Sequence, residues 1–113
     1  MFNKEIIYTI LIAGFAQILV WYQLNGQLIS QWCKAHPWVL SIAGIPISYL
    51  FILSTKYGYV GFGNLWSVRL TGFAVGMLVF PVITYFMLGE GITIKTSISI
   101  LLALCILLLQ LIN

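Results

Sequence analysis

Charged residues divide this chain into four long uncharged stretches, which run over residues 6–33, 35–55, 70–89 and 96–113. A helix rises about 1.5 Å per residue, so roughly 20 apolar residues cross a hydrocarbon core about 30 Å thick. Each stretch is long enough to cross. Lipid cannot satisfy open backbone groups, and the stretches lack the alternation of barrel strands. The pattern therefore predicts an all-α integral membrane protein with four transmembrane helices.

The expected helices together make one membrane domain that covers residues 1–113. Their approximate bounds are 6–22, 38–54, 65–88 and 93–112. The first stretch follows Lys4, as the apolar part of a signal peptide would, but it has no clear small-x-small cleavage site. We interpret it as the first span. The connecting segments leave no room for a soluble catalytic domain.

Prolines and glycines mark the expected irregularities. Pro37 suits the first turn of the second helix, where its missing N–H costs nothing. Pro46 removes the bond to the carbonyl of Ile42 and predicts a kink, and Pro81 falls inside the third helix. The segment KYGYVGFGN (56–64) predicts a flexible loop or a broken helix start.

Composition agrees with a membrane protein, since 62% of the residues are hydrophobic and 6% are charged. A soluble domain carries about 25% charged residues. The formal charge is +3, and the positive residues are scattered, so a nucleic-acid-binding face is not supported. The expected environment is a lipid bilayer.

Orientation in the membrane is weakly encoded. Lys4, Lys56 and Arg69 would gather on the side of the amino terminus, and Lys34 and Lys95 on the other side. One interpretation is that so few charges carry no signal. The other is that the chain inserts both ways and pairs antiparallel with itself.

Enzyme, metal and cofactor chemistry find no support in the sequence. His36 lies in a loop with no cysteine or carboxylate near it in sequence, and Cys33 and Cys105 have neither metal-ligand nor redox spacing. The two thiols are expected to be small apolar fillers. We expect no enzyme activity, no metal and no cofactor.

Gln17 is the first of the polar residues expected inside the membrane. An unpaired amide in hydrocarbon costs on the order of 1–3 kcal/mol or more, so it should face other helices or a wet cavity. Gly14 and Trp21 lie three and four residues away and share its helix face. Two roles stay open: an interhelical hydrogen bond, or a substrate-contacting amide.

Arg69 lies about one turn into the third expected helix, where a fixed charge is costly. It shares a face with Trp66, Gly72 and Gly76. The guanidinium could reach back to the headgroups. Alternatively, it could contact an anion in a cavity, because guanidinium groups suit phosphate and carboxylate.

Small residues predict helix-packing seams, through which the chain could meet a second copy or a partner. Gly72 and Gly76 form the small-xxx-small pattern that lets helices approach closely. Two further stripes of this kind are Ser99, Ala103, Ile106 and Gln110 on the fourth helix, and Ser41, Gly44 and Ser48 on the second.

Three segments resemble the drug/metabolite transporter superfamily in its smallest, four-helix form. They are GFAQILVWYQL (14–24), GNLWSVRLTGFAVG (63–76) and YFMLGEGITIKTSISILLALCILLLQL (85–111). The second resembles the glycine-rich third helix of the small multidrug resistance branch. The third resembles the superfamily's ending, in which an apolar helix runs into Gly–Glu, a turn and a last apolar helix.

The resemblance implies roles for particular residues. Gln17 occupies the position of the branch's glutamate, which binds cationic substrate and exchanges protons, and an amide does not titrate. Trp66 matches a substrate-stacking tryptophan, whereas Gly63 replaces a nearby tyrosine. Arg69 would repel a cationic drug. The likeness thus implies this architecture but argues against proton-coupled export of cations.

These observations predict a small transporter or flippase for a neutral or anionic molecule or lipid head group. Gln17, Trp66, Arg69, Trp21 and Gly14 are the candidate substrate-binding residues. A homodimer in a bacterial-type inner membrane is expected, and its antiparallel arrangement stays one of the two open interpretations. Its seam is expected at Gly72, Gly76, Ser99, Ala103 and Gln110. The alternative is a structural subunit that packs into a larger membrane complex and moves nothing.

Overall fold

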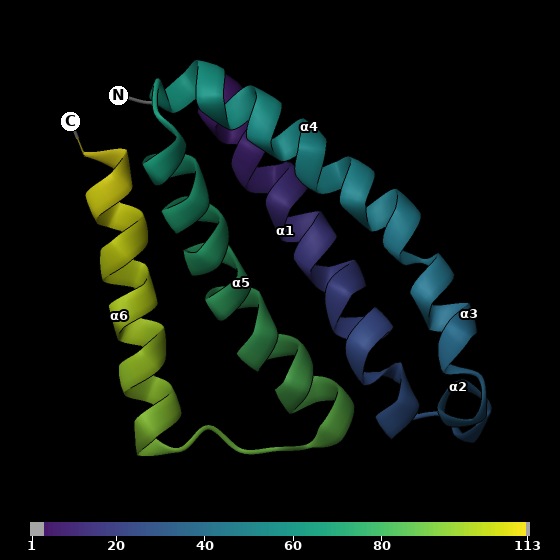
Figure 1. Cartoon of the computed structure of the whole chain (residues 1–113). Coiled ribbons are helices and arrows are strands. Elements are labelled where there is room, and N and C mark those ends of the chain that lie inside the picture. Colours follow the sequence, from purple (N-terminus) through teal and green to yellow (C-terminus); the bar gives the residue numbers. More distant parts are fainter. Residues whose placement is uncertain (1–3, 113) are drawn as a thin grey trace.

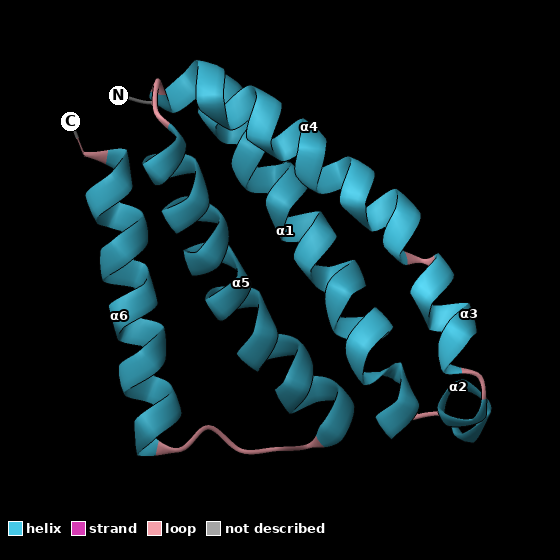
Figure 2. Cartoon of the chain, in the orientation of Figure 1, coloured by secondary structure: helices cyan, strands magenta, loops and turns pink. Residues whose placement is uncertain are grey.

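The computed structural model describes residues 4–112, and this part of the chain is helical apart from short connections (Figures 1 and 2). Four of its segments are long and apolar enough to cross a membrane. They are Lys4–Leu28, Pro37–Phe62, Leu65–Leu88 and Ile94–Leu111. The all-α fold with four membrane-spanning helices is therefore confirmed. The helices are α1 (Lys4–Asn25), η1 (Gly26–Leu28), α2 (Gln31–Ala35), α3 (Pro37–Ile42), α4 (Gly44–Phe62), α5 (Leu65–Leu88) and α6 (Ile94–Leu111).

The second span departs most from the sequence prediction. α4 continues through the glycine- and aromatic-rich segment and ends at Phe62, so the loop expected over residues 56–62 is wrong. The chain turns instead at Gly63, whose φ of 82° favours glycine. Asn64 then caps α5 by accepting a hydrogen bond of 2.8 Å from the Ser67 amide.

The prolines act largely as expected. Pro37 occupies the start of α3. The second span is interrupted at Ala43, between α3 and α4, and Pro46 lies in the first turn of α4. α5, in contrast, continues through Pro81.

The connection between the first two spans contains more helix than expected. α1 extends to Asn25, and η1 and α2 follow before Pro37. Ser30 caps α2 by accepting a hydrogen bond from the Cys33 amide. The prediction of a continuous loop between the first two expected helices, over residues 23–37, is therefore wrong, because this segment contains short helical turns.

The four spans lie side by side in the order α4, α1, α5, α6 (Figure 1). The result is a slab whose extents are 46, 35 and 18 Å. α1 begins at the end of the slab where α4 ends and α5 begins, and α6 ends there too (Figure 1). Lys4, Lys56 and Arg69 therefore lie toward the same end of the slab, which corresponds to one side of the membrane (Figure 1).

Small side chains form the core of the slab. Ala13, Ala16 and Ala74 are at most 2% exposed, and the Cβ position of Gly14 lies 3.7 Å from Val75 Cγ1. Small residues let helix backbones approach closely, which is the main source of packing energy between helices in lipid. Apart from a few such as Trp21 and Ile47, the large apolar side chains point outward, toward the surroundings that a bilayer would fill.

Candidate functional site

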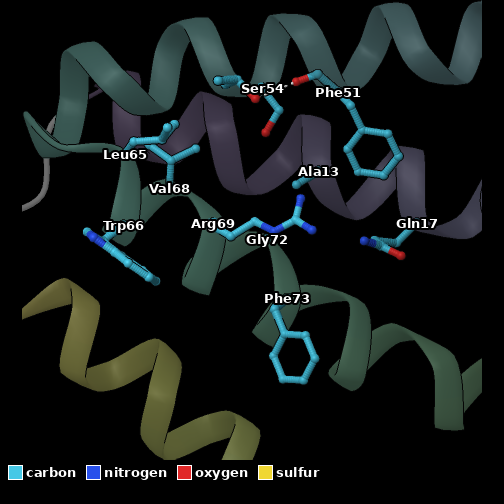
Figure 3. Close-up of a pocket in the computed structure, with 11 residues that line it drawn as sticks. Ala13, Gln17, Phe51, Ser54, Leu65, Trp66, Val68, Arg69, Gly72 and Phe73 are labelled. Atoms are coloured by element: carbon cyan, nitrogen blue, oxygen red, sulfur yellow. Dashed lines mark hydrogen bonds between the residues drawn. The ribbon is translucent and has the colours of Figure 1, made fainter.

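A cleft of about 640 Å³ lies between α4 and α5, and α1 contributes to its lining (Figure 3). Three of the predicted binding residues, Gln17, Trp66 and Arg69, line it together. Gln17 belongs to α1, and Trp66 and Arg69 belong to α5, about 50 residues further along the sequence. The complete lining is Ala13, Gln17, Phe51, Ser54, Thr55, Leu65, Trp66, Val68, Arg69, Gly72 and Phe73.

Gln17 lies at the border between the cleft and the contact of α1 with α5. Its amide approaches Gly76 so closely that a Cβ at that glycine would be 2.9 Å from Gln17 Cδ and Nε2. The side chain is half-buried, and no hydrogen bond joins its amide to another residue in the range 4–112. Of its two predicted roles, the interhelical hydrogen bond is therefore not formed within residues 4–112.

Arg69 extends its guanidinium into the cleft, on the side where Gln17 lies (Figure 3). It is exposed, and no carboxylate within residues 4–112 forms an ion pair with it. Trp66 lies at the outer rim and is 78% exposed. The guanidinium is thus a positive charge in an otherwise mainly apolar cleft, available to an anion.

The two hydroxyl groups of the cleft are already paired. Ser54 Oγ lies 2.8 Å from Thr9 Oγ1, and Ser54 can also donate to the Thr9 carbonyl at 3.1 Å. Thr55 Oγ1 donates to the Phe51 carbonyl at 2.9 Å. Gln17 and Arg69 therefore supply unpaired polar side-chain groups to the cleft.

Trp21 and Gly14 were predicted to line the same pathway, and the structure places neither in the cleft. Trp21 is 2% exposed, and its Nε1 donates a hydrogen bond of 2.9 Å to Thr84 Oγ1 on α5. Gly14 packs against Val75. Both residues hold α1 to α5, because the helix face they share with Gln17 is mostly turned toward α5.

The predicted self-association residues also divide into residues that pack within the chain and residues that do not. Gly76 receives the Gln17 side chain of the same chain, and Ala103 is 2% exposed on α6, which packs against α5. These two are therefore internal contacts, because small residues serve packing within the chain as readily as between chains. Gly72 lines the cleft, Ser99 is exposed and Gln110 is half-buried.

Sequence reasoning missed the aromatic walls and the hydroxyl pair behind them. Phe51 on α4 and Phe73 on α5 line the cleft, and nothing distinguishes them in sequence from other apolar residues of the spans. Thr9 and Ser54 are buried hydroxyl residues in α1 and α4. Their position inside apolar spans was the signal that they needed partners.

No protein-family model, no curated protein and no solved structure matches this chain. Support for the four-span membrane architecture comes from the structure itself, which has four helices long and apolar enough to cross a membrane among its described residues. The resemblance to the drug/metabolite transporters rests on the sequence segments alone.

Proposed function

We propose that this protein is a small drug/metabolite-type transporter or flippase that moves a neutral or anionic molecule or lipid head group. The observation that carries the proposal is the cleft, which brings Gln17, Trp66 and Arg69 together. The unpaired guanidinium favours an anion, and the amide offers both donors and an acceptor. Because Gln17 does not titrate, the protein would not exchange a cationic drug for protons at this position.

A homodimer accompanies this proposal. The chain is a slab 18 Å thick, and helices with their side chains are about 10 Å wide. Such a slab leaves its cleft open along one face. A second copy would pack through α6, where Ala103 is the one buried residue among Ile94–Leu111, and would leave the mouth of the cleft free.

The test is transport by the purified protein in vesicles. The anionic probe is phosphatidylglycerol with a fluorescent acyl chain, and dithionite quenching follows the movement of this lipid between leaflets. The cationic probe is tetraphenylphosphonium. The protein should accelerate movement of the anionic lipid and leave the cation unaffected. Arg69→Ala and Gln17→Ala should each slow the movement at least about tenfold, because each removes a polar contact in the cleft.

Lys56→Ala is the matched control, since Lys56 is an exposed cation at the same end of the slab. It should transport normally. Normal transport by both Arg69→Ala and Gln17→Ala would show that the site is assigned wrongly.

The second candidate is a structural subunit of a larger membrane complex. The observation that favours it is the outer surface of α6, where Leu101, Leu102 and Leu108 are more than half exposed. Solubilisation in mild detergent followed by mass measurement separates the two candidates. A discrete homodimer supports the transporter, whereas co-purification at a fixed ratio with larger proteins supports the subunit.

A further inference from the structure

The mouth of the cleft runs from the end of α5, where Leu65 and Trp66 are exposed, along the flank of the slab. Phe73 lines the cleft and is 57% exposed, although it lies eight residues after Leu65, the first residue of α5. That separation is about 12 Å along the helix. In a bilayer the mouth therefore opens into hydrocarbon as well as toward the surface.

Polarity changes with depth along this mouth. Arg69 lies four residues into α5, about 6 Å from the helix end, which is the level of lipid headgroups. Phe73 and Phe51 form the adjacent walls. Gln17 lies 13 residues into α1, about 20 Å from the same end, near the middle of the span.

The floor beside Arg69 has room for a ligand. Beyond its chain neighbours and its own helix backbone, no atom of the described residues lies within 4 Å of the Cβ position of Gly72, whereas the same position at Gly76 is filled by Gln17. The volume of about 640 Å³ also falls in the range of small-molecule sites. A charged group at Arg69 can thus continue into an apolar segment along Gly72 and Phe73.

We infer that the ligand of this cleft is an anionic amphiphile that enters sideways from the surrounding leaflet. Its acidic head contacts the Arg69 guanidinium, and its apolar tail lies between Phe51 and Phe73. Charge complementarity supports this occupant, because no carboxylate in residues 4–112 pairs with Arg69. The inference rests on the proposed function and names its substrate class.

The test measures lipid selectivity in the absence of transport. The purified protein is reconstituted in phosphatidylcholine, and spin-labelled phosphatidic acid is compared with spin-labelled phosphatidylcholine of the same acyl chain. Electron paramagnetic resonance gives the fraction of each probe that the protein immobilises. We expect the association constant to be at least about threefold larger for phosphatidic acid.

Four variants locate the preference. Arg69→Gln should reduce it to that of phosphatidylcholine, while Lys56→Gln, an exposed cation at the same end, should retain most of it. Gly72→Leu keeps the charge but fills the floor of the cleft, so it should also remove the preference. Gly72→Ala should retain it, and circular dichroism of every variant verifies that the helices form.

Several results would overturn the inference. They are equal immobilisation of the two probes, an equal loss in Lys56→Gln and Arg69→Gln, or an unchanged preference in a folded Gly72→Leu. Displacement of phosphatidic acid by millimolar inorganic phosphate would assign the site to a soluble anion. Dissociation of a dimer by Arg69→Gln would assign the cleft to a second copy of the chain.

The outcome is separable from that of the proposed function. A selective cleft in a protein that fails to move fluorescent phosphatidylglycerol contradicts transport and leaves the ligand class in place. Movement of that lipid without selective immobilisation contradicts the ligand class instead.

Discussion

Gly58 lies where α1, α4 and α5 meet. A Cβ at this position would be 2.9 Å from Thr9 Oγ1 and 3.0 Å from Val68 Cγ2. Gly58→Ala should therefore lower the free energy of unfolding by about 1 kcal/mol or more, because the overpacking cost exceeds the helix-propensity gain of alanine. Titration with sodium dodecyl sulfate, followed by circular dichroism, measures this change.

Gly72→Ala is the control for this substitution. It replaces the same residue type in a helix, but its Cβ meets nothing within 4 Å. The variant should be as stable as the original protein or slightly more stable. If the two alanine variants unfold alike, Gly58 is not the close-packed junction described above.

A buried hydrogen bond joins α1 to α5 near the carboxyl ends of both helices. Trp21 Nε1 donates to Thr84 Oγ1, and both side chains are at most 8% exposed. A double-mutant cycle with Trp21→Phe and Thr84→Val should give a coupling energy of about 0.6–2 kcal/mol, the range for such bonds in membrane proteins. The unfolding titration in detergent provides the four free energies.

Thr55 and Ser99 offer a control cycle, because they lie in α4 and α6 and their hydroxyls bond within their own helices. Their double replacement by alanine should be additive within about 0.5 kcal/mol. Additivity of the Trp21 and Thr84 replacements would instead mean that this bond does not hold the helices together.

The boundaries of the elements were predictable where apolar length decided them. α5 was expected over residues 65–88 and spans Leu65–Leu88. The end of α4 was not predictable, because Gly58 and Gly63 look alike in sequence. One packs inside a helix contact and the other turns the chain at positive φ. Only their neighbours in space distinguish them.

The four-span arrangement can be tested with the two native cysteines. Cys33 is half-buried in α2 between the first two spans, and Cys105 faces outward from the interior of α6. A membrane-impermeant maleimide should label Cys33 in open membrane fragments and should not label Cys105, which is surrounded by lipid. Mass spectrometry of the labelled peptides quantifies both reactions.

Sealed vesicles of uniform orientation then report how the whole molecule inserts. Complete or absent labelling of Cys33 indicates one orientation, and labelling of about half of the molecules indicates insertion in both orientations. The balanced positive charges do not decide between these two outcomes. Cys33→Ser should abolish the signal and serves as the control. Labelling of Cys105 in intact membranes would contradict α6 as a span.

The need for lipid, the number of spans and the costly polar positions follow from the order of residues alone, because hydrocarbon tolerates neither open backbone nor isolated charge. Gln17 and Arg69 were predictable in this way, whereas Trp66 was predicted from the resemblance to the small multidrug resistance branch. Which of the small and polar residues face one another depended on the packing of the slab. The packing placed Trp21 on Thr84, Gln17 against Gly76, and Phe51 opposite Phe73 across the cleft. Apolar helices are alike along their length, so their contacts are selected by close fit in three dimensions and leave little trace in the sequence.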